Sequence, residues 1–162
     1  MDTIIREMLE LSRIEAHDFQ VLEEVPLKAL CTDLITRYNL VCEEKAIQVV
    51  VEGDAVITAD NALIQRVIDN FFVNALDHTP SGGLIRVQIT STTLEFYNSG
   101  STIPEEKIQE IWQPYKKADE SRNSTKGTGL GLSIASTILE QYHFSYGARN
   151  EGDGVVFWFR FG

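Results

Sequence analysis

The sequence predicts a two-layer α+β fold, in which helices pack on one face of a mixed, largely antiparallel sheet. Helix-like and strand-like segments are interspersed along the 162 residues. The last two predicted strands, 144–150 and 155–161, flank the turn Gly152-Asp153-Gly154 and read as a hairpin. Because hairpin-linked strands run antiparallel, an all-parallel, doubly wound sheet is excluded.

The first half of the chain is predicted to contain three helices and two short strands. Residues 4–14 have apolar side chains at helical spacing along a narrow seam, and we expect them to end a longer helix of a preceding domain. A second helix is predicted from Pro26, which suits the first helical position, to about residue 45. Strands are predicted at 47–52 and 56–58. Asp60 is then predicted to cap a long helix that reaches residue 78.

The second half is predicted to be richer in strands. A turn at Ser81-Gly82-Gly83 leads into strands 84–89 and 94–97, which are predicted to form a hairpin. The remaining predicted elements are a short helix at 104–112, a polar loop at 119–126, a helix at 132–142 and the C-terminal strand pair.

The composition is that of one ordinary globular domain, with 43% hydrophobic and 23% charged residues. A formal net charge of −10 argues against a nucleic-acid partner, although an acidic protein can still hold a single nucleotide in a local pocket. Cys31 and Cys42 are too far apart along one predicted helix to bridge, and no zinc-ligand spacing is present, so reduced thiols are expected. The sequence has no signal peptide and no apolar run long enough to span a bilayer.

A polar stripe on the otherwise apolar helix 63–78 is the most informative feature. The apolar positions at helical spacing are Leu63, Ile64, Val67, Ile68, Phe71, Phe72, Ala75 and Leu76. Asn70 and Asn74 share one face of this helix, which Arg66 and His78 extend. A buried carboxamide without a partner costs about 1–3 kcal/mol, so a polar group is expected to meet this stripe. The alternative is a half-exposed helix whose polar edge faces water.

Alternating glycines precede the predicted helix 132–142, in the run Lys126-Gly127-Thr128-Gly129-Leu130-Gly131-Leu132-Ser133. They allow a close backbone approach, and free amides at a helix start favour an anion. The run is not a P-loop, because no Lys-Ser or Lys-Thr follows its last glycine, nor a dinucleotide fingerprint, because no strand precedes it. The polar residues 119–125 before it are typical of a lid over a ligand. A flexible turn and a plain solvated loop are the alternatives.

A third polar element follows the predicted strand 94–97. Asn98 stands at the strand end, Gly100 turns the backbone, and Pro104 starts the next helix. Alone, this pattern is equally typical of a simple turn between a strand and a helix. Its position between the asparagine helix and the glycine run is more informative than the turn itself.

This ordered set resembles the ATP-binding domain of sensor histidine kinases, within the superfamily of gyrase, heat-shock chaperone, mismatch-repair and histidine-kinase ATPases. Residues 70–75 resemble the N box of that family, and 98–100, 111–115 and 127–132 resemble its first glycine box, aromatic box and second glycine box. Residues 9–15 resemble the end of the helical hairpin that carries the phosphorylated histidine. The resemblance implies a Bergerat-type fold. Residues 1–17 would be a remnant of the dimerisation helix and linker, and residues 18–162 the catalytic ATP-binding domain.

The resemblance also implies roles for individual residues. Asn74 would bind Mg²⁺ with support from Asn70, and Asn98 would meet the adenine edge. Backbone amides of the glycine run would hold the phosphates, and Arg122 would reach them from the lid. The full set of ATP-binding residues implied is Asn70, Asn74, His78, Asn98, Gly100, Ile103, Arg122, Gly127, Thr128, Gly129, Leu130 and Gly131.

The implied reaction is transfer of the γ-phosphoryl group of Mg-ATP to a histidine, for relay to a response regulator. Hydrolysing relatives have a glutamate base where Asn70 stands, and an amide cannot accept a proton at neutral pH. His17, His78 and His143 do not fit the position of the phosphoacceptor. We therefore expect the acceptor in a dimerisation domain outside this chain, which forms a homodimer in the full protein. The chain would be a cytoplasmic domain that meets the membrane only through other parts of a membrane-anchored sensor.

Three positions depart from the pattern of the family. Asn98 replaces an aspartate, and because an amide both donates and accepts, weaker base discrimination is predicted. Thr102 replaces a glycine, and Asp77 stands where a cation often faces the phosphates, which predicts weaker binding. These departures support an alternative, a degenerate noncatalytic module for nucleotide binding or partner docking. A serine kinase of the anti-sigma-factor type is a second alternative, against which residues 9–15 argue.

Overall fold

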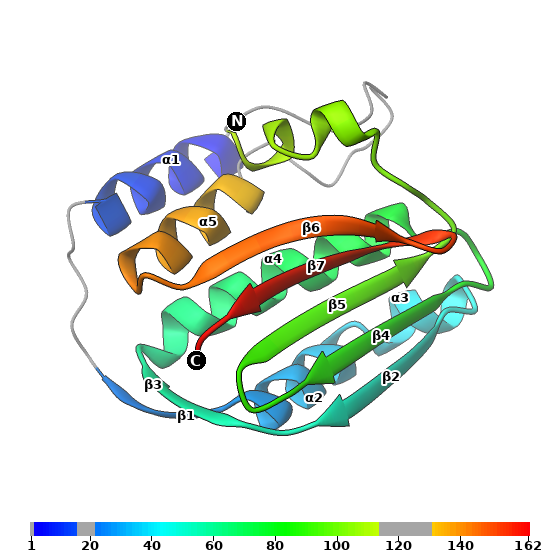
Figure 1. Ribbon diagram of the computed structural model, residues 1–162, viewed down its shortest axis with the longest axis horizontal. Helices are drawn as coiled ribbons and strands as arrows, with labels where there is room; N and C mark the ends of the chain where they lie inside the picture. Colours follow the sequence, from blue (N-terminus) through cyan, green and yellow to red (C-terminus); the bar gives the residue numbers. More distant parts are fainter. Residues whose placement is uncertain (1, 16–21, 114–130) are drawn as a thin grey trace.

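The computed structural model describes residues 2–15, 22–113 and 131–162, and every structural statement below refers to these ranges. A five-stranded sheet forms one layer, and helices cover one of its faces (Figure 1). The helices are α1 (Asp2–Glu15), α2 (Leu27–Arg37), α3 (Asn39–Glu44), α4 (Asn61–His78) and α5 (Gly131–Gln141). Two short 3₁₀ helices are η1 (Glu105–Lys107) and η2 (Glu110–Trp112).

The strands of the main sheet are arranged in the order β2-β4-β5-β7-β6. Their bounds are β2 (Gln48–Gly53), β4 (Leu84–Ile89), β5 (Thr93–Ser99), β6 (Ser145–Glu151) and β7 (Gly154–Arg160). Among the described strands of this sheet, β2 and β4 pair in parallel, whereas β4–β5, β5–β7 and β6–β7 are antiparallel. The predicted fold class and both predicted hairpins are confirmed.

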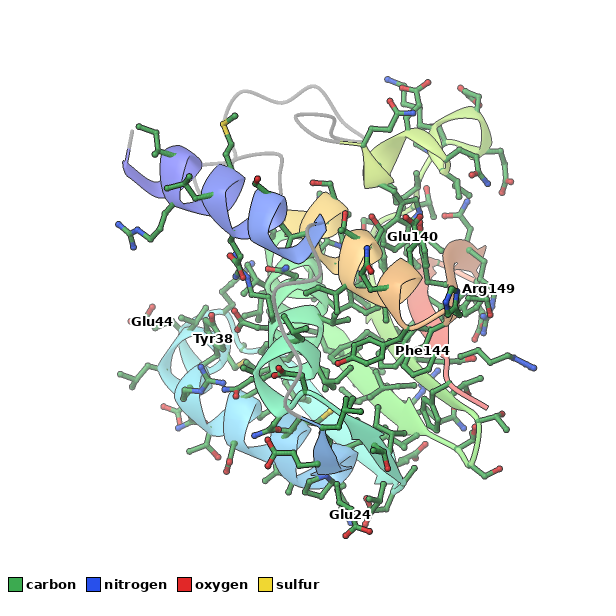
Figure 2. The ribbon with its side chains drawn as sticks, turned by 90° about the vertical axis from the view of Figure 1, so that its left-hand side faces the viewer. Glu24, Tyr38, Glu44, Glu140, Phe144 and Arg149 are labelled. Carbon is green, nitrogen blue, oxygen red and sulfur yellow. The ribbon has the colours of Figure 1, made fainter. Side chains whose placement is uncertain are left out.

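The core lies between the sheet and α4. Side chains of β4 and β5 alternate between buried and partly exposed, as expected for strands with one covered face. From the helix side, Phe71 contacts the rings of Phe96 and Phe157, with centroids 6.0 Å apart in each case. Seen edge on in Figure 2, side chains fill the space between the two layers.

A second, two-stranded sheet was not predicted. It pairs β1 (Glu23–Pro26) with β3 (Val56–Ala59) in an antiparallel register that sets Pro26 opposite Val56. Pro26 therefore has an extended backbone, with φ −83° and ψ 108°, and precedes α2 instead of opening it. The sequence-based expectation for Pro26 was wrong because strand pairing decides its conformation.

The predicted helix 26–45 is also divided, into α2 and α3, at Tyr38. The hydroxyl of Tyr38, a residue labelled in Figure 2, donates to Asp69 Oδ1 of α4 at 3.2 Å, and the Tyr38 ring lies 5.7 Å from that of Phe72. These contacts with α4 fix Tyr38 outside the helical backbone geometry, at φ −100° and ψ 16°. Cys31 and Cys42 thus lie on different helices, and both are free, buried thiols.

The predicted helix 104–112 is replaced by η1 and η2. Each is a single tight turn closed between residues three apart, as in the bonds from Lys107 N–H to Pro104 O and from Gln113 N–H to Glu110 O. Packing of Trp112 against Tyr146, with ring centroids 4.8 Å apart, and burial of Ile111 hold the second turn against the sheet. Within the described ranges, no helix is both long and apolar enough to cross a membrane.

Candidate functional site

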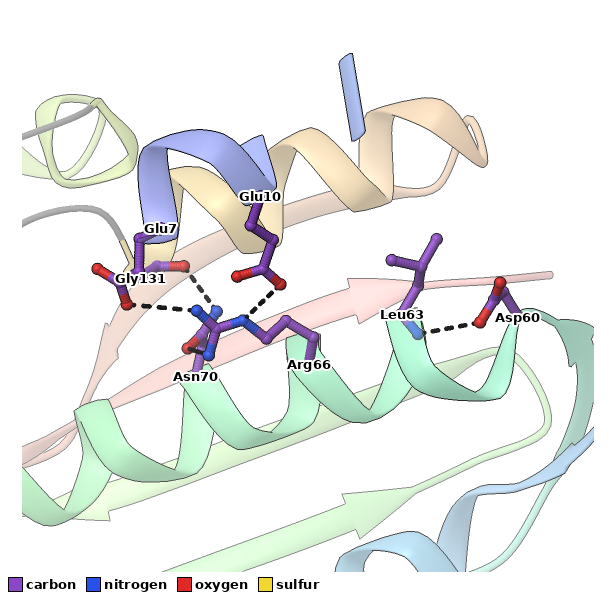
Figure 3. Close-up of polar contacts among 7 residues, drawn as sticks. All are labelled: Glu7, Glu10, Asp60, Leu63, Arg66, Asn70 and Gly131. Atoms are coloured by element: carbon purple, nitrogen blue, oxygen red, sulfur yellow. Dashed lines mark hydrogen bonds and ion pairs between the residues drawn. The ribbon is translucent and has the colours of Figure 1, made fainter. Parts of the chain in front are cut away.

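The polar stripe of α4 is positioned by the start of that helix and by its apolar face. Asp60 caps the helix as predicted, because its Oδ1 accepts from the N–H group of Ala62 at 3.0 Å and from that of Leu63 at 3.3 Å. Figure 3 shows the bond from Leu63. All eight predicted apolar positions of the helix are buried. The face that bears Arg66, Asn70 and Asn74 is therefore turned away from the centre of the core and lies half buried.

Asn70 joins α4 to the beginning of α5. Its Nδ2 donates to the backbone oxygen of Gly131 at 2.9 Å, and its Oδ1 accepts from Arg66 Nη1 at 3.4 Å (Figure 3). The structure thus brings together two of the predicted site residues, Asn70 and Gly131. The last glycine of the run is placed at the start of a helix, as the sequence predicted.

Arg66 extends this network to the first helix of the chain. Its Nη2 lies 3.3 Å from Glu7 Oε2, and its Nε lies 3.0 Å from Glu10 Oε2 (Figure 3). Helix α1, distant in sequence, is therefore fastened to α4 by two ion pairs, and it also packs against α5 (Figure 1). The stripe was predicted, but these acidic partners were not.

Asn74, one turn beyond Asn70, differs in its surroundings. Its Nδ2 is buried and has no hydrogen-bond partner among the described residues. An unpaired buried donor costs about 1–3 kcal/mol, so it points to a polar group that completes the site. A carboxamide is chemically suited to this, because its oxygen is a ligand that Mg²⁺ accepts and its nitrogen can donate to a phosphate.

The end of β5 lies beside the end of α4. A side chain on Gly100 would place its Cβ 2.5 Å from Pro80, which follows α4 closely in the chain. Gly100 also has φ +88°, in the left-handed region that favours glycine. Both observations explain why this predicted site residue is a glycine. Its N–H donates to the backbone oxygen of Asp153 at 2.8 Å.

Asn98 and Ile103 occupy the two ends of the segment around Gly100. Asn98 is only 1% exposed, and its Nδ2 donates to Ser101 Oγ at 3.2 Å. Ile103 is buried, and its backbone is held by the side chain of Asn150, a residue of β6 that sequence reasoning missed. An asparagine within a strand is unfavourable, and this was the signal that could have identified it.

The other predicted site residues lie at the end of α4 or outside the described residues. His78 is the exposed last residue of α4, and Asp77 beside it is half buried. Arg122, Gly127, Thr128, Gly129 and Leu130 lie outside the described residues, as does the predicted loop 119–126.

The sheet, the covering helices and the asparagine stripe define a class of ATP-binding fold. Residues 59–162 match the family described as histidine kinase-, DNA gyrase B- and HSP90-like ATPases, and the chain belongs to that family. Membership implies ATP binding. The fold is the one seen in histidine kinase catalytic domains: the catalytic domain of histidine kinase ThkA superposes with a TM-score of 0.76 and 27% identity, covering 88% of this chain and 95% of that one.

Two further comparisons extend the likeness beyond the matched family region. The sensor protein CzcS of Cupriavidus metallidurans is 32% identical over 85% of this chain, which spans 30% of the length of CzcS. The structure of ThkA in complex with the response regulator protein TrrA is 27% identical, with a TM-score of 0.76, and covers 99% of this chain and 46% of that one. The chain thus spans about a third of the length of the curated relatives it matches, at 30%, 36% and 32% of the first three.

Proposed function

We propose that this chain is the catalytic part of a two-component sensor histidine kinase and transfers the γ-phosphoryl group of Mg-ATP to a histidine of a dimerisation domain. The observation that carries the proposal is the buried amide of Asn74, which has no partner among the described residues, one turn from the contact between Asn70 and Gly131. Membership in an ATPase family and the likeness to sensor kinases support it.

In this proposal Asn74 would hold Mg²⁺ with support from Asn70, and the ion would neutralise negative charge on the phosphates of ATP. Asn98, Gly100 and Ile103 would line the adenine pocket. His78, the last residue of α4, would be a further contact to ATP. Gly127, Gly129 and Gly131 offer backbone amides to the phosphates, with Arg122, Thr128 and Leu130 completing the set.

The residues around Asn70 favour transfer over hydrolysis. An amide cannot remove a proton from water, and the amide of Asn70 is already engaged by Arg66 and Gly131. The neighbouring Asp69 is no substitute, because its carboxylate accepts from Tyr38 on another side of α4. Positioning and charge stabilisation would then supply most of the catalysis, and the nucleophile would come from another domain.

The same proposal assigns residues 1–17 to the end of a dimerisation helix and 18–162 to the catalytic domain. The phosphoacceptor histidine would lie in the dimerisation domain of a homodimer, and a response regulator would receive the phosphoryl group. The complex of ThkA with TrrA supports such a partner. The domain would be cytoplasmic, and the membrane would be reached only through other parts of the protein.

Calorimetry tests the nucleotide site directly. We expect the chain to bind ATP with Mg²⁺ but not with EDTA, and Asn74→Ala to weaken binding about tenfold or more. Asn61→Ala is a matched control: Asn61 lies on the same helix and also has a buried amide atom without a described partner, but it is outside the stripe. Equal losses in the two variants, or no magnesium dependence, would contradict the proposed site.

Radiolabelling tests whether the phosphoacceptor histidine lies outside this chain. With γ-labelled ATP, the chain alone should label negligibly, whereas the chain preceded by its natural upstream residues should label a histidine. Label on His17, His78 or His143 of the isolated chain would overturn this assignment.

A noncatalytic module is the second candidate, supported by Asn98, Thr102 and Asp77. Tight, magnesium-dependent binding would disfavour it.

Within the kinase proposal, Asn98 should reduce the preference for ATP over GTP, and a large ATP preference in calorimetry would count against this. Asp77→Lys should strengthen nucleotide binding, and unchanged affinity would mean that the side chain points away from the phosphates.

A further inference from the structure

The segment between β5 and η1 carries two proposed adenine contacts but lies outside the regular hydrogen bonding of the sheet. At its far end, the Ile103 N–H donates to Asn150 Oδ1 at 2.8 Å, and the Ile103 oxygen accepts from Asn150 Nδ2 at 2.8 Å. One side chain, 47 residues away in sequence, thus satisfies both backbone groups of one residue.

This pairing depends on the carboxamide group. Asparagine presents a donor and an acceptor side by side, so it meets a residue as the peptide group of a neighbouring strand would. Since β6 is an edge strand that pairs only with β7 in the described sheet, the side chain of Asn150 continues the pairing where the strand ends. Its Nδ2 also lies 3.1 Å from Glu105 Oε2, at the start of η1.

The other end of the segment is held by the same hairpin. Gly100 N–H donates to the backbone oxygen of Asp153, in the turn between β6 and β7, at 2.8 Å. Asp153 Oδ1 accepts from the Tyr97 hydroxyl at 3.0 Å. The segment from Gly100 to Ile103 is therefore held at both ends by residues at the tip of the β6–β7 hairpin, and Ile103 is buried.

We propose that Asn150 is a positioning residue for the nucleotide base. It fixes the backbone of Ile103, and through it the segment that follows Asn98, in the geometry that receives adenine. Asn150 would not touch the phosphates. Substitution of Asn150 should therefore weaken only the part of the Mg-ATP affinity that comes from contacts with the base. This inference rests on the proposed nucleotide site.

The test compares Mg-ATP with Mg-tripolyphosphate, which lacks the base. Asn150→Asp keeps the size and the acceptor of the side chain but sets a carboxylate against the Ile103 oxygen and Glu105. We expect it to weaken Mg-ATP binding about tenfold or more, while competition by Mg-tripolyphosphate stays within about twofold of wild type. Asn150→Ser, which introduces no charge, should show the same selectivity with a smaller loss.

Asn39→Asp is the matched control. Asn39 is exposed on α3, and its Nδ2 donates to Glu43 Oε2 at 3.1 Å, so the substitution makes the same change beside the same type of partner, away from the site. It should leave the binding of both ligands unchanged. Hydrogen exchange gives a second readout: the Ile103 amide should exchange faster in Asn150→Ser than in wild type, while core amides of β5 keep their protection.

The outcomes separate the two proposals. Wild-type affinity for Mg-ATP in both Asn150 variants would overturn the role of Asn150 and leave the nucleotide site standing. Equal weakening of both ligands would also overturn it, since a merely structural residue would act on the whole site. Absence of Mg-ATP binding by the wild-type chain would overturn the proposed function, and this inference with it.

Discussion

At the scale of single residues, Asn70 and Asn74 occupy successive turns of α4 but differ in how their amides are satisfied. Asn70 uses its nitrogen toward Gly131 and its oxygen toward Arg66. The nitrogen of Asn74 is buried and has no partner among the described residues. One asparagine therefore stabilises the fold, whereas the other is kept at a cost in stability that a ligand would explain.

This difference predicts opposite effects on stability. Asn70→Ala should lower the free energy of unfolding by about 0.5–1.5 kcal/mol, because the part-buried oxygen of Gly131 and Arg66 Nη1 each lose one hydrogen bond. Asn74→Ala should leave it unchanged or raise it by about 1 kcal/mol, since it removes an unpaired donor and adds a better helix former. Urea unfolding followed by circular dichroism measures both. Similar destabilisation by the two variants would show that the Asn74 amide has a partner in the folded chain.

The polar stripe of α4 could be predicted from the sequence, but the residues that contact the site from other elements could not. Helical spacing alone placed Asn70 and Asn74 on one face, because the period of the helix is fixed. Asn150 was missed because its contact with Ile103 joins segments 47 residues apart, and such a distance leaves no local pattern. Glu7 and Glu10 were missed as partners of Arg66 for the same reason.

At the scale of elements, local signals succeeded where the local chain decides the structure. Asp60 caps α4 through hydrogen bonds within its own first turn, which a sequence can indicate. The break at Tyr38 and the extended Pro26 were not predicted, because contacts with Asp69 and with Val56 override local preference. The helix boundaries that were predicted wrongly are those determined by contacts with another element.

The cap of α4 can be tested separately from the site. Asp60→Ala should lower the free energy of unfolding by about 0.5–2 kcal/mol, because the N–H groups of Ala62 and Leu63 lose their acceptor. Asp60→Asn retains an acceptor oxygen and should lose much less. Denaturant unfolding measures the difference, and equal losses in the two variants would assign the effect to the charge of Asp60. Mg-ATP affinity should be unchanged in both.

The attachment of α1 to α4 gives a second prediction at this scale. Arg66 and Glu10 have side chains that are 24% and 28% exposed, so their pairing is partly shielded from solvent. A double-mutant cycle with Arg66→Ala and Glu10→Ala should give a coupling of about 0.5–1 kcal/mol. It should fade at about 1 M NaCl, where charges are screened within about 3 Å.

The pair formed by Arg149 and Glu151 is the control for this cycle. Its side chains are 45% and 48% exposed, and the two groups lie 3.2 Å apart. Greater exposure should reduce its coupling below that of the Arg66 pair. A coupling near zero for Arg66 and Glu10 at low salt would mean that apolar contacts, not charge, hold α1 in place.

At the scale of the whole molecule, the order of the elements defined the fold class before any single contact was known. Hairpins were recognisable because their strands are adjacent in sequence, and they supply most of the antiparallel pairing. The parallel pairing of β2 with β4 was not predicted, since α4 and β3 intervene between the two strands. The placement of Gly131 beside Asn70 likewise required the assembled layers.

The thiol of Cys31 and the hydroxyl of Tyr146 make the free energy of unfolding depend on pH. Burial in the core raises the pKa of the Cys31 thiol from 9.0 to about 12. Burial, followed by a hydrogen bond to Glu140, raises the pKa of the Tyr146 hydroxyl from 10.0 to about 12. In each case the unfolded chain ionises first as the pH rises, so the folded state binds more protons in alkali.

The free energy of unfolding should therefore fall in alkali and should be insensitive to these two groups below about pH 9. Between about pH 9 and pH 12 Cys31 alone should contribute a decline of up to about 1.4 kcal/mol per pH unit, because only its unfolded form is a thiolate there. Urea unfolding at a series of pH values measures this slope. Cys31→Ala should be less stable at neutral pH, since it leaves a cavity, but should decline less steeply above pH 9. Parallel slopes for wild type and variant would show that the thiol ionises in the folded protein as readily as in the unfolded chain.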